Sequence, residues 1–184
     1  MYIFDRAGRK NTEKTLELAY QCAKDKAIKE IVLASTHGDT ALKAVEMMDT
    51  RELRLIVITH NYGFKEPGKI EMSDEVRKRL NEKGAVVYTG TMPFRNIGTA
   101  IRQGMKYSQQ DLIANTLRLL CQGVKVCVEL ALMASDAGLI GTDDIITIAG
   151  TGRGADTACI IKPASSNNLF ALKLRQIIVK PYDW

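Results

Sequence analysis

The sequence predicts an α/β protein, a three-layer sandwich in which helices cover both faces of a mostly parallel β-sheet. Short apolar runs alternate along the chain with segments of helical periodicity, the order that parallel strands and crossover helices produce. The apolar runs are nearly continuous, as strands buried on both faces require. With 184 residues and no linker, low-complexity stretch or internal repeat, we expect a single domain over residues 1–184.

The first half of the chain supplies three helices and three strands. An apolar stripe predicts a helix over 12–27, and a second helix is expected over 41–48. Ser73 is expected to cap a third helix over 74–83. The expected strands of this half are EIVLAS (30–35), LRLIVIT (53–59) and AVVYTG (85–90).

In the second half, residues 91–106 contain Pro93 and glycines and predict a loop with one short helical piece. Ser108 then opens a capping box and the longest helical pattern, over 109–137. Part of this pattern is apolar almost all round, which predicts burial against the sheet and a homo-oligomer. The expected strands are IITIA (145–149), DTACIIK (156–162) and an edge strand, LRQIIVK (174–180).

The segment GTGRGAD (150–156) follows a strand and contains the spacing G-x-G-x-x-A of a dinucleotide-binding fingerprint. That fingerprint needs a helix after the glycines and an acidic residue about 20 positions on. The next residues are β-prone instead, so we expect a hairpin turn. Its glycines either supply only the positive φ of the turn, or its N–H groups form an anion-binding nest with Arg153 as a free guanidinium donor.

Polar residues follow each expected strand, at the sheet edge where ligands bind in open parallel sheets. The loop 35–40 leads into a helix start, which favours an anion, although its polar residues can equally cap the helix. Tyr62 and Phe64 can stack on a flat ring or cover the sheet edge. The expected ligand-binding residues are Ser35, Thr36, His37, Gly38, Asp39, Thr40, His60, Asn61, Gly63, Gly90, Gly150, Thr151, Gly152, Arg153, Gly154 and Asp156.

Three side chains are candidates for catalysis. His37 and His60, the two histidines of the chain, can act as acid–base groups or satisfy only loop carbonyls. Glu129 lies in an apolar helical stretch, where a buried carboxylate needs a partner. Lys125, four residues earlier, offers either that partner or the other half of a solvated stripe.

Composition and charge limit the kinds of binding partner and the location that we expect. The net charge of +5 favours an anionic partner, but the positive residues are scattered and no nucleic-acid motif accompanies them, so we expect no nucleic acid. No apolar stretch approaches ~18 residues, so we expect no membrane span. The absence of a leader pattern favours the cytoplasm. The four cysteines form no C-x-x-C pair, and we expect no metal site.

Two segments resemble a known domain. IVLASTHGDTA (31–41) resembles the strand, loop and helix start, and GLIGTDDIITIAGTGRGADTACII (138–161) the last hairpin, of the C-terminal domain of pyruvate kinase. Over most of residues 12–161 the chain resembles the stand-alone, mainly archaeal proteins of the pyruvate kinase C-terminal-domain-like family. The resemblance implies a mixed sheet of about five strands with an antiparallel last strand. It implies no pyruvate kinase activity, which belongs to a separate barrel domain.

The resemblance also implies a ligand. In some pyruvate kinases this domain holds a phosphorylated effector, and members of the stand-alone family are suspected of binding flavin mononucleotide (FMN). The positions that carry over are Ser35, His37, Gly38 and Thr40 on the phosphate loop, and Arg153 and Gly154 on the facing hairpin. Asp39 departs from the family pattern, in which this position of the loop often carries a neutral or basic residue, and an acid there disfavours a phosphate.

We therefore expect a binding module for a phosphate-bearing small molecule, with FMN as a candidate. Two alternatives stay open. One is an enzyme acting on a phosphorylated or nucleotide ligand, with His37 or His60 as acid–base. The other is an oligomeric interaction module with a vestigial pocket.

Overall fold

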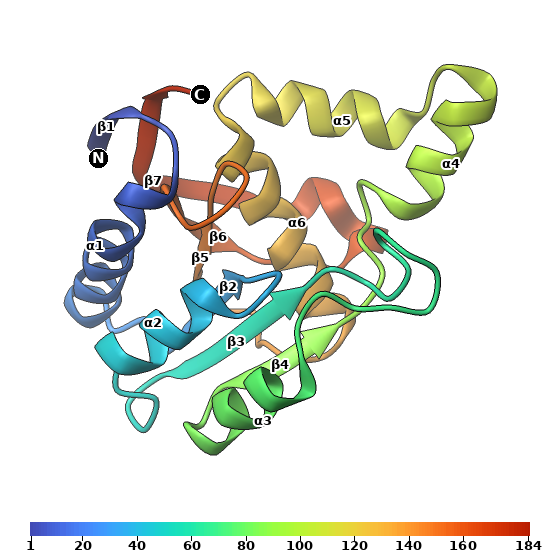
Figure 1. Cartoon of the computed structure of the whole chain (residues 1–184). Helices are drawn as coiled ribbons and strands as arrows, with labels where there is room; N and C mark the ends of the chain where they lie inside the picture. The colour runs from blue at the N-terminus through green and yellow to red at the C-terminus, as the bar shows by residue number, and fades with distance from the viewer.

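Seven strands form one sheet in the computed structural model, which describes residues 1–184 (Figure 1). Their spatial order is β1-β7-β6-β5-β2-β3-β4. The strands are β1 (Tyr2–Arg6), β2 (Glu30–Ala34), β3 (Arg54–Thr59), β4 (Val86–Thr89), β5 (Ile145–Ala149), β6 (Thr157–Lys162) and β7 (Lys173–Asp183). The α-helices are α1 (Thr12–Asp25), α2 (Asp39–Met47), α3 (Asp74–Glu82), α4 (Asn96–Met105), α5 (Gln109–Arg118) and α6 (Gln122–Asp136). Arg9–Asn11 and Ser166–Ala171 form short 3₁₀ helices.

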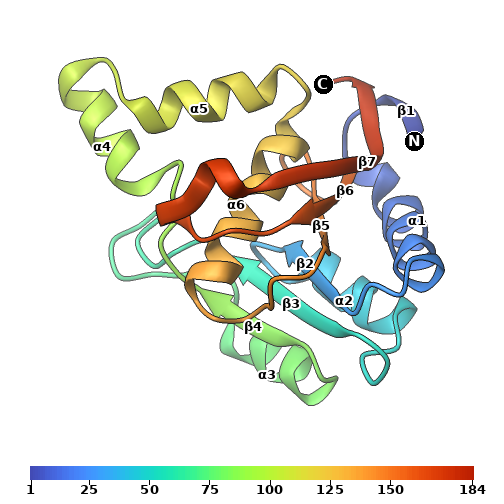
Figure 2. The same ribbon diagram turned by 180° about the vertical axis from the view of Figure 1, so that it is seen from behind.

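The sheet lies between two helical layers, which confirms the predicted three-layer α/β class. Helices α1, α2 and α3 pack on one face, around a core that includes Leu16, Ile31 and Leu80. Helix α6 covers the other face, seen from behind in Figure 2, around a second core that includes Val32 and Leu132. The strands between the two cores are therefore apolar on both faces, as their continuous apolar runs predicted.

The sheet is larger than predicted. All pairs are parallel except those of β6, which runs antiparallel to β5 and to β7. The antiparallel strand is thus the predicted 156–162 segment, but it is not the last one. β7 pairs with β6 on one side and in parallel with β1 on the other, so the predicted edge position of 174–180 is wrong. β1 was not predicted because only Phe4 of its five residues is buried, so the strand lacks the continuous apolar run of the central strands.

The predicted helix over 109–137 is two helices, α5 and α6, which diverge in Figure 1. The N-cap of α6 is Cys121, whose Sγ accepts a hydrogen bond from Val124 N at 3.4 Å. Gly123, in the first turn of α6, sits against β6, where a Cβ would fall 2.0 Å from Thr157 Oγ1. The break therefore lets α6 begin in direct contact with the sheet.

Residues 96–105, predicted mostly as loop, form α4. Gly98 does not break this helix: a Cβ there would lie 2.7 Å from Gln110 Cβ, so the glycine permits close packing of α4 on α5. The predicted caps are confirmed. Ser108 Oγ accepts from Asp111 N at 3.1 Å, and Ser73 Oγ accepts from Val76 N at 3.3 Å. None of the helices has the length and apolar character that crossing a bilayer would require.

Residues 150–156 form the predicted hairpin turn between β5 and β6. The strands are antiparallel, and Asp156 N donates to Ala149 O at 3.0 Å. Gly152 and Gly154 have φ values of 76° and 87°, in the left-handed region that favours glycine. No helix follows the glycines, so the dinucleotide-binding fingerprint lacks its structural context.

Candidate functional site

A cavity of about 410 Å³ opens at the carboxyl ends of β2 and β3. Its wall is built from the loop 35–40, the start of α2, the turn 150–154, α6 and the segments that follow β3 and β4. The predicted site residues that line it are Ser35, Thr36, His37, Asp39, Thr40, His60, Glu129, Gly150, Gly152, Arg153 and Gly154. The predicted residues outside the lining are Gly38, Asn61, Gly63, Gly90, Thr151 and Asp156.

The start of α2 faces this cavity. Gly38, its N-cap, has φ 97°, and a Cβ there would fall 2.2 Å from Val76 Cγ1. Ser35 Oγ accepts from Ala41 N at 3.3 Å, so the capping role considered for this loop is real but covers one N–H group. Asp39 and Thr40 occupy the first two helical positions, where N–H groups lack an intrahelical acceptor. The positive end of the α2 dipole is therefore directed at the cavity.

Arg153 is not the free donor that its glycine neighbours predicted. Its Nε and Nη2 lie 2.6 and 2.5 Å from Asp39 Oδ2, and Arg9 Nη2 lies 3.9 Å from the same oxygen. The pair joins the β5–β6 turn to the start of α2. A ligand anion that used Arg153 would have to displace the Asp39 carboxylate.

Asp156 is a structural residue in this geometry. Its carboxylate is fully buried and accepts from Gly8 N at 3.0 Å and Thr151 N at 3.1 Å. The Thr157 hydroxyl donates to its other oxygen at 2.8 Å. These bonds tie the N-terminal segment to the hairpin turn and leave the carboxylate outside the cavity.

Glu129 and Lys125 form a buried ion pair in the cavity wall, with each side chain only 3% exposed. Glu129 Oε1 also accepts from Phe94 N at 2.8 Å. Burial lowers the pKa of Lys125, while the Glu129 carboxylate opposes that shift. The alternative of a solvated stripe is wrong, because both faces of this part of α6 pack inside the chain.

The two histidines differ sharply. The Nδ1 atom of His60 lies 3.2 Å from Glu71 Oε1, and its Nε2 lies 3.4 Å from Thr36 Oγ1. Its ring packs on Phe64 with a centroid separation of 3.8 Å. Burial lowers the pKa of His60, while Glu71 acts in the opposite direction. His37 is exposed and hydrogen-bonds to no side chain or backbone group of the protein.

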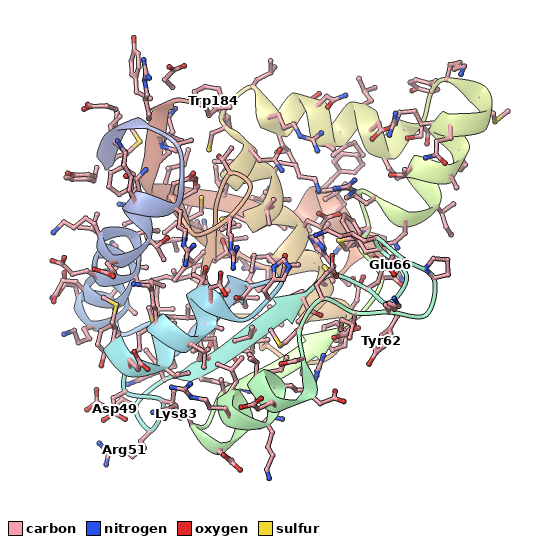
Figure 3. The ribbon with its side chains drawn as sticks, in the orientation of Figure 1. Asp49, Arg51, Tyr62, Glu66, Lys83 and Trp184 are labelled. Carbon is pink, nitrogen blue, oxygen red and sulfur yellow. The ribbon has the colours of Figure 1, made fainter.

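Sequence reasoning missed two cations of the site, Lys65 and Arg95, which line the cavity from the segments after β3 and β4. The Arg95 guanidinium lies 4.7 Å from the centre of the Phe64 ring. Phe64 therefore already contacts His60 and Arg95. Tyr62 does not line the cavity and lies on the outer side of its loop (Figure 3).

The cavity has an excess of positive charge. Four cationic side chains line it, Lys65, Arg95, Lys125 and Arg153, against two carboxylates, Asp39 and Glu129. Lys65 and Arg95 lie in loops without a recognisable sequence motif. Only their position in the segments after β3 and β4 could have indicated that they belong to the site.

The family model described as "Pyruvate kinase, alpha/beta domain" matches residues 13–161. The chain belongs to this family. The match contains every residue that lines the cavity of this pyruvate kinase α/β domain, and it excludes β1 and β7. The predicted relationship to the C-terminal domain of pyruvate kinase is therefore confirmed, whereas the archaeal, stand-alone assignment stays a prediction.

Two solved structures similar to this chain are a pyruvate kinase from Cryptosporidium parvum and the Cryptosporidium parvum pyruvate kinase in complex with ADP. Each is 18% identical, matches 83% of this chain and has a TM-score of 0.44. The chain covers 22% and 23% of those proteins, less than a quarter of their length.

Proposed function

We propose that this protein binds a phosphate-bearing small molecule in the cavity at the carboxyl ends of β2 and β3. One observation carries the proposal: the N-terminus of α2 and an excess of cationic side chains meet in the same cavity. The volume of about 410 Å³ is in the range of small-molecule sites. Pyruvate kinase chemistry is not part of the proposal.

The two sides of the cavity suit two parts of one ligand. Thr36, Asp39 and Thr40 present the polar side, where a phosphate would accept from the first N–H groups of α2. Met92 and Leu130 belong to the apolar side, which suits a ring or a carbon chain. Arg95 and Lys65 stand at the cavity as further phosphate ligands.

FMN remains our candidate ligand within this class. The polar side fits its phosphate, and the apolar side chains Met92, Leu130 and Met133 would hold its ring. Phe64 is less suited to stacking, since it already contacts His60. When bound, FMN would supply redox chemistry, while the residues of this chain would bind and orient it.

The first experiment is an absorption and mass spectrum of what the natively purified protein releases on denaturation. A titration with FMN, nucleotides and sugar phosphates follows. Arg95→Ala should weaken binding of any phosphate-bearing ligand by about tenfold or more, the loss of one hydrogen bond to a charged group. Arg79→Ala, which changes an exposed arginine of α3 outside the cavity lining, is the matched control and should leave affinity unchanged. The absence of affinity for every compound would refute the proposal.

Asp39 provides a second, oppositely directed test. Because its carboxylate pairs with Arg153 at 2.6 Å, it competes with a ligand phosphate for that guanidinium. Asp39→Asn should therefore tighten binding of phosphate-bearing ligands, measured in the same titration. Weaker binding would show that Asp39 itself holds the ligand.

Oligomer formation is a second candidate function. The surface that favours it is not the apolar helical stretch that the sequence suggested. Helix α6 is buried within its own chain. Large apolar side chains are exposed instead on and beside α4 and α5: Ile97, Met105, Tyr107, Leu112 and Leu119. Light scattering on Met105→Lys and Leu112→Lys variants tests whether this surface joins two copies. A cytoplasmic location stays a prediction.

A further inference from the structure

His60 is contacted at both ring nitrogens and on its ring by Phe64. Glu71 Oε1 lies 3.2 Å from Nδ1, which favours the tautomer with the proton on Nδ1. Nε2 then carries the lone pair and lies 3.4 Å from the Thr36 hydroxyl, itself a cavity-lining group. The Phe64 ring, 3.8 Å away, restricts rotation of the imidazole. These contacts orient the side chain with Nδ1 toward Glu71 and the unprotonated Nε2 toward the hydroxyl of Thr36, a residue that lines the cavity.

The surroundings of His60 combine an uncharged ring with nearby cations. Burial is the main cause that lowers the pKa of His60, and Arg95 and Lys65 act in the same direction. These two cations line the same cavity as His60. A neutral imidazole next to two cations and the N-terminus of a helix is the environment that a nucleophile attacking a phosphate needs, because the cations neutralise the oxygens of the incoming group.

We propose that His60 Nε2 accepts a phosphoryl group from a phosphomonoester or phosphoanhydride bound in the cavity, with Glu71 as the positioning residue. The inference rests on the proposed function, since the phosphate must first lie in this cavity. It goes further by assigning a covalent step to one atom.

The Nε2 lone pair forms an N–P bond, and the P–O bond to the leaving group breaks. The leaving oxygen departs with the bonding electron pair and takes a proton from solvent. The ring now carries a positive charge, which the Glu71 carboxylate at Nδ1 offsets. Water then attacks the phosphorus, inorganic phosphate leaves, and the neutral imidazole is restored.

His37 supplies an internal reference. It lines the same cavity, but it is exposed and lacks both a carboxylate and a hydroxyl partner. Any histidine reacts slowly with a small phosphoryl donor in solution. The ratio of the phosphorylation rates of His60 and His37 within one folded chain therefore measures how far the surroundings of His60 accelerate its reaction. This measurement needs no variant.

The experiment treats the full chain with acetyl phosphate, a mixed phosphoanhydride, and maps the adduct by mass spectrometry of peptides over time. His60 should react about a hundredfold faster than His37, the low end of what a positioned catalytic group contributes. The adduct should be acid-labile, as an N–P bond is. Equal rates at the two histidines, no adduct at His60, or an acid-stable adduct on Thr36 would each overturn the proposal.

Two variants separate the covalent step from binding. Glu71→Gln should slow phosphorylation of His60 by about tenfold to a hundredfold, as when the carboxylate that orients a histidine is removed. Its affinity for inorganic phosphate, measured by calorimetry, should stay unchanged. His60→Gln should abolish the acid-labile adduct at that position. Loss of phosphate binding in the unaltered protein would refute the proposed function, whereas binding without an adduct would refute this inference alone.

Discussion

The two ends of the sheet each carry a hollow, and the larger one is the poorer candidate. The amino end has a depression of about 770 Å³ lined by Lys26, Glu30, Arg51, Arg54 and Asp144, among others. Its charged groups are largely exposed and pair with each other or with neighbours, as Arg51 does with Asp49 and Arg54 with Glu30. Figure 3 shows Asp49, Arg51 and Lys83 together at this end, far from Tyr62 and Glu66 near the other.

The carboxyl end has a smaller cavity, but three of its ionisable groups are withdrawn from water, whereas Lys65, Arg95 and Arg153 are exposed. Lys125 and Glu129 are buried, and His60 is half-buried. Charges shielded from water act on a ligand far more strongly than exposed charges do. Helix starts also face this end in a parallel sheet. Buried polar groups, rather than volume, therefore make the carboxyl end the better candidate site.

The largest expected effect would come from Lys125→Met. It leaves Glu129 buried without its counter-charge, which should lower the free energy of unfolding by about 3–5 kcal/mol. The measurement is urea denaturation at neutral pH. The control is Lys78→Met, which removes an exposed pair of the same spacing with Nζ 3.9 Å from Glu82 Oε1. That change should cost about 0.5 kcal/mol or less. Similar losses for both would break the distinction between buried and exposed charges.

Asp156→Ala should come second. The change removes the acceptor of two backbone N–H groups and a hydroxyl. A loss of about 2–3 kcal/mol in the free energy of unfolding is expected, because buried donors lose a charged acceptor. Affinity for phosphate-bearing ligands at a temperature where the variant is folded should not change. A loss of affinity without a loss of stability would instead show that Asp156 contributes to ligand binding.

A smaller effect concerns pH. Because burial lowers the pKa of His60, the unfolded chain, whose imidazole titrates near ~6.5, binds this proton more readily than the folded chain. The stability due to neutral His60 is therefore present above pH ~6.5 and is lost as pH falls from there to the lower folded pKa.

Urea denaturation at several pH values between neutral and mildly acidic measures how steeply the free energy of unfolding falls with falling pH. His60→Gln should flatten this slope. Glu71→Gln should steepen it, because Glu71 raises the pKa of His60 and its removal enlarges the difference between the two states. An unchanged slope in both variants would show that His60 is not buried as described.

The smallest effect is expected at the amino end. Arg51 holds the pKa of Asp49 at about 2 through two side-chain hydrogen bonds and one backbone hydrogen bond. Arg51→Ala should raise the Asp49 pKa toward its ordinary value, observed by NMR titration. The affinity for ligands at the carboxyl end should stay the same. A change in that affinity would show that the two ends of the sheet are energetically coupled.

The local features of the fold could be predicted from the amino-acid sequence. Continuous apolar runs identified β2, β3 and β4, and the failed fingerprint context identified the β5–β6 hairpin. The rule for carboxyl ends of parallel strands placed Thr36, His60 and Arg153 at one edge, where they line one cavity. These features could be predicted because each depends on residues adjacent in the chain, or on a topology that the alternation of elements already implies.

The burial of individual charges and the long-range contacts became visible only in the folded chain. The spacing of Lys125 and Glu129 equals that of Lys78 and Glu82, yet one pair is buried and the other exposed. The Asp39–Arg153 pair joins residues 114 positions apart. In the same way, the break before α6 and the pairing of β1 with β7 depend on contacts with distant elements. Local periodicity contains no information about such contacts, because burial and long-range pairing arise only when the whole chain packs.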